Sequence, residues 1–266
     1  MRDVEGMLLR HAQALYAPWD SYMEENILKN QMVAIHAEGE LIGYANLNGE
    51  QLFSFYVAQA FYRFAPQILA QLISEYGIKS AQVLTNDPLS AALIMEWDCE
   101  LIDYGACFFV DALRLDMPNV RAEQPVFREA TVEDIDRIVS ATGDFFDKLA
   151  HRIAERTIFL LEDGGELMGC GIVEVGAVCA DCVSIGMITR KDHRRKGVAQ
   201  RMLWHLKEWA YAHGLRPIAG CWYYNVLSRK SLEAAGMIAT GKGYSVALKE
   251  KKPLPLRTGN PPGELV

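Results

Sequence analysis

Short apolar runs alternate with longer amphipathic segments along most of the chain. Runs of four to six residues at 32–35, 52–57, 158–161 and 183–188 consist mainly of aliphatic and aromatic residues, and their length favours strands over helices. After the last run, apolar residues recur at helical spacing at Val198, Met202, Leu206, Trp209 and Ala210, whereas Gln200, Arg201, Lys207 and Glu208 fall off that face. A strand, this helix and a further strand predict a βαβ crossover, and the other strands are spaced as hairpins. We expect an α/β fold with a mixed, mostly antiparallel sheet flanked by helices.

The two halves of the chain repeat this pattern. The string GELIGY at 39–44 recurs as GELMGC at 165–170, each time between two apolar runs, which indicates a β-hairpin with a glycine turn. Each half continues with a β-run, a helix that ends at a glycine, a β-run that reaches an asparagine, a short helix and two final strands. The glycine and asparagine are Gly77 and Asn86 in the first half, and Gly214 and Asn225 in the second. A short string can match by chance, but the shared order of elements over a period of about 130 residues favours a duplicated domain.

Charge divides the chain in the same way. Residues 1–120 hold 6 Lys and Arg against 16 Asp and Glu, whereas residues 121–266 hold 21 against 18. Two prolines and no apolar periodicity mark the segment between the halves. We predict a first domain over 1–115, a linker over 116–125, a second domain over 126–250 and a proline-rich tail over 251–266.

Composition excludes several classes of protein. No apolar run approaches the roughly 20 residues of a membrane span, and the N-terminus lacks a signal-peptide pattern, so we expect a cytoplasmic protein without a membrane partner. A net charge of -7 argues against nonspecific nucleic-acid binding. Cys179 and Cys182 form a lone Cys-x-x-Cys without a second ligand pair, so we predict reduced core thiols and no metal site.

A basic segment stands between a predicted strand and the amphipathic helix. Five Lys and Arg side chains occur within residues 190–196. At a helix N-terminus, unpaired amides and basic side chains together favour a bound phosphate. Gly197 and the small Ala199 would let the backbone approach it closely. A solvated basic turn or a linear targeting signal are the alternatives.

Two motifs give these residues a family resemblance. Arg194-x-x-Gly197-x-Ala199 resembles the pyrophosphate loop of the GNAT superfamily of acyl-CoA-dependent N-acyltransferases, although Lys191 stands where a proline is common. Asn225-x-x-Ser228, followed by a helix that ends at Gly236, is similar to a second segment of that family, although Asn225 and Gly236 also suit helix capping. The resemblance covers about residues 126–249 and implies tandem GNAT-like domains that use acetyl-CoA or a longer acyl-CoA. The implied CoA-binding residues are Met187, Ile188, Thr189, Arg194, Arg195, Lys196, Gly197, Val198, Ala199, Gln200, Asn225 and Ser228.

The catalytic groups are less well defined. Many GNAT enzymes carry a tyrosine seven residues after the motif asparagine as the general acid, whereas this chain has Leu232. Tyr223, Tyr224 or water could protonate the leaving thiolate instead. A general base is also needed, because an amine with a pKa near 10 is mostly protonated at neutral pH. Glu174 and Asp181, around the hairpin that precedes the predicted strand at 183–188, are the candidates.

The first half lacks the loop motif. Residues 57–66 contain one basic side chain and no Arg-x-x-Gly-x-Gly/Ala, so we interpret this half as a degenerate GNAT-like domain that does not bind CoA. Its acidic surplus would either attract a cationic amine or only aid solubility. We predict an acetyl-CoA-dependent N-acetyltransferase of a small-molecule primary amine. The alternatives are a protein lysine or N-terminal acetyltransferase and a CoA-binding regulatory pseudoenzyme.

Overall fold

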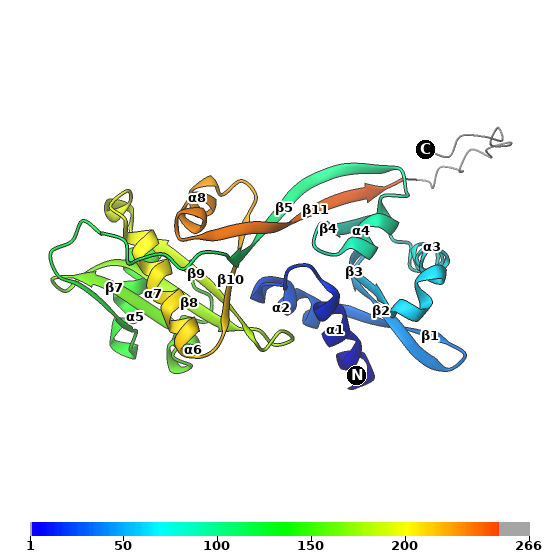
Figure 1. Cartoon of the computed structure of the whole chain (residues 1–266), viewed down its shortest axis with the longest axis horizontal. Coiled ribbons are helices and arrows are strands. Elements are labelled where there is room, and N and C mark those ends of the chain that lie inside the picture. Colours follow the sequence, from blue (N-terminus) through cyan, green and yellow to red (C-terminus); the bar gives the residue numbers. More distant parts are fainter. Residues whose placement is uncertain (1, 250–266) are drawn as a thin grey trace.

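The computed structural model describes residues 2–249, and the predicted tail at 251–266 lies outside them. The two halves form two lobes of an elongated molecule, joined by a sheet that continues from one lobe to the other (Figure 1). Within the described residues this sheet has eleven strands in the order β1-β2-β3-β4-β11-β5-β10-β9-β8-β7-β6. The predicted α/β fold with a mixed sheet is confirmed, because the parallel pairs β3–β4 and β9–β10 stand among antiparallel ones.

The two halves share their order of elements from the first hairpin onward, as the sequence predicts. The first half consists of α1 (Arg2–Ala14), α2 (Ser21–Lys29), β1 (Gln31–Ala37), β2 (Glu40–Asn48), β3 (Gln51–Val57), a 3-10 helix (Gln59–Phe64), α3 (Ala65–Tyr76), β4 (Ser80–Leu84), α4 (Pro88–Ile94) and β5 (Cys99–Asp111). The second consists of β6 (Pro125–Glu129), 3-10 helix η2 (Val132–Asp134), α5 (Ile135–Thr142), α6 (Leu149–Ala154), β7 (Ile158–Asp163), β8 (Glu166–Val175), β9 (Cys182–Thr189), 3-10 helix η3 (Lys191–His193), α7 (Val198–Ala212), β10 (Arg216–Trp222), α8 (Val226–Ala234) and β11 (Met237–Leu248). The first half differs in opening with two helices and no strand.

The prediction of two final strands in each half is wrong. Each half ends in one long strand, of 13 residues in β5 and 12 in β11, which crosses into the other half instead of turning back. β5 is inserted between β11 and β10, and β11 between β4 and β5. Three irregularities of register in the β5–β11 ladder let the pair follow the sheet from lobe to lobe. Each half therefore completes the sheet of the other.

Helices cover both faces of the sheet. On one face α3 and α4 pack on the first half, while α7 and α8 pack on the second around residues such as Val183 and Ile185. On the opposite face α5 and α6 cover β7 and β8, and α1 and α2 cover the first half. The core under α1 and α2 also includes Cys182 and Ile218 of the second half, so α2 lies at the junction of the lobes.

The segment between the domains follows α7 closely. Leu115 accepts a hydrogen bond from the Trp204 indole at 3.0 Å, and Pro118 accepts one from Arg201 at 3.1 Å. Lys207, placed off the apolar face by its spacing, is instead 3% exposed. Its Nζ donates to the carbonyl of Leu113 at 2.8 Å and lies 2.6 Å from Asp111 Oδ1, because the end of β5 and the start of the linker pass over it. Among the described helices, none is both long and apolar enough to span a membrane.

Candidate functional site

The site is built around a fork between the parallel strands β9 and β10. The two strands pair only from Cys182–Arg216 to Ser184–Ile218 and then separate. Beyond the fork β9 stays paired with β8, and β10 stays paired with the inserted strand β5. The end of β9 is therefore left with one edge that no strand covers within residues 2–249.

Backbone amides of β9 face this open edge. At the two ends of the β8–β9 ladder the amide of Arg190 donates to Met168 and the amide of Gly176 donates to Cys182, each at 3.0 Å. Because hydrogen-bonded positions alternate along an antiparallel pair, the even-numbered residues of β9 bond to β8. The odd-numbered residues Met187 and Thr189 thus direct their amides into the fork, where they can donate to a ligand.

The basic loop leads from this strand to an uncapped helix. Arg195 has a φ of 61° and Gly197 a φ of 84°, so both residues adopt the left-handed conformation as the chain turns into α7. No side chain caps the N-terminus of α7 among the described residues. The first-turn amides therefore keep the positive end of the helix free for an anion. No described carboxylate lies within ion-pair distance of Arg194 or Arg195, whereas Arg190 pairs with Glu166 and Asp192.

Gly197 is constrained for a reason that the sequence does not reveal. A Cβ atom on Gly197 would lie 2.7 Å from the carbonyl oxygen of Asn119 and 3.4 Å from Cα of Val120. The linker therefore occupies the space beside Gly197 in which we expected a ligand. Together with its positive φ, this contact explains why a glycine stands here.

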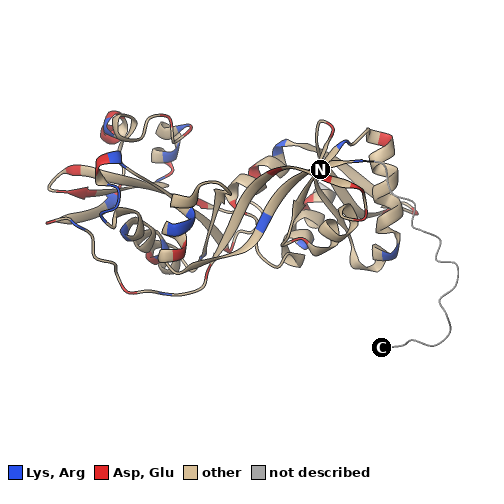
Figure 2. Cartoon of the chain, turned by 90° about the horizontal axis from the view of Figure 1, so that it is seen from above, with Lys and Arg blue, Asp and Glu red and all other residues tan. Residues whose placement is uncertain are grey.

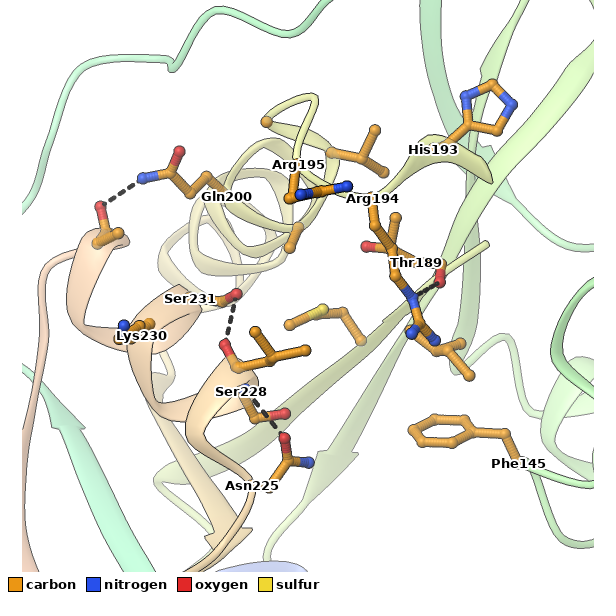
Figure 3. Close-up of a pocket in the computed structure, with 17 residues that line it drawn as sticks. Phe145, Thr189, His193, Arg194, Arg195, Gln200, Asn225, Ser228, Lys230 and Ser231 are labelled. Carbon is orange, nitrogen blue, oxygen red and sulfur yellow. Dashed lines mark hydrogen bonds between the residues drawn. The ribbon is translucent and has the colours of Figure 1, made fainter. Parts of the chain in front are cut away.

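A cavity of about 710 Å³ joins the fork, the loop and α8. Figure 3 shows Arg194, Thr189 and Phe145 on one side of it and Asn225 and Ser228 on the other. All the CoA-binding residues predicted from the sequence line this cavity except Lys196, whose carbonyl accepts a hydrogen bond from the amide of Arg121. The sequence did not point to the further lining residues Phe145, Leu227, Lys230, Ser231 and Ala234.

The second motif has the capping role that the sequence left open. Asn225 Oδ1 accepts a hydrogen bond from the amide of Ser228 at 3.1 Å and so caps α8. This bond uses only the oxygen of the side chain, which leaves the Nδ2 donors for a ligand. Asn225 and Ser228 both line the cavity, so capping and ligand contact are compatible.

Leu232 and Ser231 bear on proton transfer at the cavity. Leu232, at the position of the family tyrosine, is 4% exposed and packs in the core under α7 and α8. Its neighbour Ser231 lines the cavity instead, but its hydroxyl donates to the carbonyl of Leu227 at 2.9 Å.

Thr189 Oγ1 is buried without a hydrogen-bond partner among the described residues, although Thr189 lines the cavity. An unpaired buried hydroxyl is costly, so this atom suits contact with a ligand.

The candidate bases are already engaged. Glu174 accepts a hydrogen bond from Ser21 at 2.8 Å and pairs with Arg152 at 2.5 Å. Asp181 is exposed and pairs with Arg216, which lowers the pKa of its carboxyl group. Neither lines the cavity. Their assignment as bases stays a prediction that the structure does not favour.

The candidate acids lie at the end of β10. Tyr223 stacks on Tyr104 with ring centroids 4.5 Å apart, and the Arg229 guanidinium lies 5.3 Å from its ring centroid. Tyr224 is half exposed, and loss of hydration together with the charge of Asp103 raises its pKa. Tyr224 therefore keeps its proton at neutral pH, as a general acid must.

Both halves of the chain match known protein families. A family model described as an acetyltransferase (GNAT) domain matches residues 1–112, and one described as the acetyltransferase (GNAT) family matches residues 117–237. An acetyltransferase of the GNAT family from Colwellia psychrerythraea has a TM-score of 0.78 at 18% identity, covering 93% of this chain and 97% of that one. A tandem GNAT protein from the clavulanic acid biosynthesis pathway has a TM-score of 0.61 at 13% identity, covering 95% and 96%. No curated protein matches the sequence.

Proposed function

Since the chain belongs to the GNAT acetyltransferase family, with one domain of that family in each half, we propose that it transfers the acetyl group of acetyl-CoA to a primary amine of a small molecule. Members of this family use acyl-CoA as a co-substrate. We place the CoA site in the second half. The 3-10 helix Gln59–Phe64 takes the position of the loop in the first half, where the single cation Arg63 lies over the ring of Phe64.

One observation carries the proposal. A single cavity contains the free amides of Met187 and Thr189, the uncapped N-terminus of α7 and two cations without carboxylate partners among the described residues. These groups suit the successive parts of acetyl-CoA. Strand amides can hold the amides of the pantetheine arm and polarise the thioester carbonyl, and the helix N-terminus with Arg194 and Arg195 can bind the pyrophosphate.

The covered face of the fork supports a small acceptor. On the side opposite α7, the amide of Ser21 donates to Ser184 Oγ at 2.8 Å, at the last paired position of β9. The start of α2 therefore lies over the fork. An acceptor amine that approaches from this side must enter between the lobes and cannot lie across an open surface, which favours a small molecule over a protein chain.

Isothermal titration with acetyl-CoA, followed by thiol release over a panel of amines and peptides, tests the proposal. We expect acetyl-CoA to bind and small primary amines to be turned over in preference to lysine and N-terminal peptides. Absence of acetyl-CoA binding would overturn the proposal. Binding without thiol release would instead indicate a CoA-binding regulatory protein, which the buried Leu232 in place of the family tyrosine would explain.

A further inference from the structure

A second cavity lies between the two lobes, on the face of the sheet opposite α7. Its volume is about 390 Å³, within the range of small-ligand sites. Both halves line it, and no CoA residue predicted from the sequence does. The side chains that define its chemistry are Asp20, Tyr22, Phe53, Gln82, Phe108 and Trp222.

We propose that this cavity binds the acceptor as a primary amine on an aromatic or aliphatic body, and that Asp20 of the first half receives the proton of its ammonium group. The inference rests on the proposed function and names its substrate class. The first half, which has no CoA loop, would then provide the carboxylate that acts as the general base, which the second half does not supply.

The position of Asp20 relative to the fork supports this role. Its Oδ2 atom lies 1.6 Å from the point that a Cβ of Gly220 would occupy, so the carboxylate fills the space of the missing side chain. Gly220 follows the last paired residue, Ile218, by two positions. Ser21, the residue after Asp20, donates a hydrogen bond from its amide to Ser184 Oγ on β9 at 2.8 Å. Asp20 thus stands where β9 and β10 separate, and Figure 1 shows α2 beside β10 between the lobes.

One carboxylate oxygen of Asp20 is free to accept a proton. Oδ1 accepts a hydrogen bond from the amide of Met23 at 2.9 Å and so caps α2. Oδ2 accepts none from another residue in the described part of the chain, although the residue is only 7% exposed. Glu174, a candidate base from the sequence, has both oxygens engaged by Ser21 and Arg152.

The surroundings of Asp20 favour a proton acceptor at neutral pH. Burial raises its pKa to about 6, aided by the carboxylates of Glu174 on β8 and Glu24 on α2 and opposed by the hydrogen bond from Met23. Arg152 on α6 neutralises Glu174, and Cys221 is the titratable residue of β10 that interacts electrostatically with Asp20. The strands β3 and β4 present Phe53, Gln82 and Leu84, which carry no charge. Among the residues that the structure describes, Asp20 is therefore the only charged one that lines the cavity.

The lining residues also define the class of amine. Tyr22 and Trp222 line the cavity and are 64% and 57% exposed, so they reach from it to solvent, while Phe53 and Phe108 are buried inside. Aromatic faces attract both apolar bodies and cations. An anionic substituent would find no basic partner among the lining residues.

The proton balance of the reaction is complete with these groups. The ammonium group gives one proton to Asp20 Oδ2, and the freed nitrogen lone pair forms a bond to the thioester carbon. The tetrahedral intermediate then breaks its C–S bond, and the leaving thiolate takes the second proton from nitrogen, directly or through water. Asp20 returns its proton to solvent, which leaves an amide and free CoA.

A thioether analogue tests the cavity independently of turnover. We compare CoA with CoA whose sulfur carries CH2-CO-NH-CH2CH2-phenyl, and with the same linker ending in a carboxylate. We expect the phenyl analogue to bind at least tenfold more tightly than CoA and the carboxylate analogue not to gain. If CoA itself does not bind, the proposed function fails. If CoA binds and the phenyl tail adds nothing, the acceptor cavity alone is wrong.

The variant Asp20→Asn tests the carboxylate. Asparagine also caps helices, and it removes a buried charge whose raised pKa costs stability at pH 7, so we expect an unchanged or higher melting temperature. Acetyl-CoA affinity should not change. Phenethylamine, measured with CoA present, should bind at least tenfold more weakly than to wild type, and the rise in its turnover through pH about 6 should disappear.

Two controls separate function from folding. Asp87→Asn changes another buried aspartate that caps a helix of the first half, and it should affect the melting temperature but not amine binding. Gly220→Ala should displace the Asp20 carboxylate and weaken amine binding in wild type, but add little in an Asp20→Ala background. Equal amine affinity and pH profiles for Asp20→Asn and wild type would overturn the role of Asp20.

Discussion

The carboxylate of Glu24, in the first half of the chain, accepts a hydrogen bond from the amide of Cys179, in the second, at 2.9 Å. The same carboxylate also accepts from the amides of Ala177 and Val178, so it binds three consecutive amides of the turn between β8 and β9. Glu24 is 2% exposed. This face of the second half, where we propose that the acceptor binds, is thus held in place by a side chain of the first.

Replacing this carboxylate should loosen the junction between the lobes. In Glu24→Gln one oxygen becomes an amide donor that faces backbone amides, so we expect a loss of about 1–3 kcal/mol in the free energy of unfolding. Urea denaturation measures the change. Glu25→Gln, at the exposed neighbouring position where Glu25 pairs with Lys29, should cost less than about 0.5 kcal/mol. Equal effects of the two substitutions would show that the turn is held by other contacts.

A network of arginine–carboxylate ion pairs in the second half should make the stability of the fold depend on pH. Asp134 is 4% exposed, and the Arg128 guanidinium holds the pKa of its carboxyl group well below the usual value. A lowered native pKa stabilises the fold above the unfolded pKa of about 3.9, and this contribution is lost as the pH falls toward the native pKa. Asp134→Asn should therefore cost about 1–3 kcal/mol at pH 7 and progressively less below pH 4.

The comparison with a nearby carboxylate makes this prediction specific. Asp136, exposed in the first turn of α5, has no ion pair among the described residues, so Asp136→Asn should change the free energy of unfolding by less than about 1 kcal/mol at any pH. Denaturation curves at several pH values measure both variants. A penalty for Asp134→Asn that does not decrease in acid would show that hydrogen-bond geometry, rather than charge, stabilises the network.

The basic loop can be tested through its side chains more cleanly than through Gly197, whose replacement would displace the linker at Asn119. Arg194 lines the cavity and has no carboxylate partner in the described structure. If it contacts the pyrophosphate, Arg194→Ala should weaken CoA binding about tenfold and reduce its salt dependence, and should leave the binding of pantetheine unchanged. Calorimetry with both ligands measures this. Lys191→Ala, in the same basic segment but outside the cavity, serves as the control, and equal losses in both variants would point to a diffuse charge effect.

Local sequence signals placed the basic loop, where we propose that CoA binds, because backbone conformation and helix capping depend on neighbouring residues. Glycines, an asparagine cap and apolar spacing placed the strand, the loop and both helices. The exchange of β5 and β11 left no such signal, because pairing between distant strands depends on the whole sheet. Asp20 was missed for a similar reason, since in sequence it is only a capping residue before a short helix, and Gly220, 200 residues later, brings it to the fork.

The acidic surplus of the first half, which we expected either to attract a cationic amine or only to aid solubility, includes residues that pair with cations. Asp111 pairs with Lys207, and Glu100 pairs with Lys249. Seen from above, acidic and basic residues are interspersed along both lobes (Figure 2). The structure therefore favours one buried carboxylate between the lobes, rather than a broad acidic surface, as the feature that would attract a cationic amine.

The orphaned hydroxyl of Thr189 allows a test in which stability and binding change in opposite directions. Thr189→Val keeps the shape of the side chain but removes the buried Oγ1 that has no partner in the described structure. In the free protein this should leave the melting temperature unchanged or raise it, because an unsatisfied polar atom is lost. Acetyl-CoA should bind severalfold more weakly if the ligand, when bound at the end of β9, becomes the hydrogen-bond partner that this hydroxyl lacks. Thr189→Ser should retain the affinity for acetyl-CoA but lose some stability, because it keeps the hydroxyl and removes a methyl group. Thermal denaturation and calorimetry on the three proteins measure both effects, and a valine variant with wild-type affinity would place the ligand away from the end of β9.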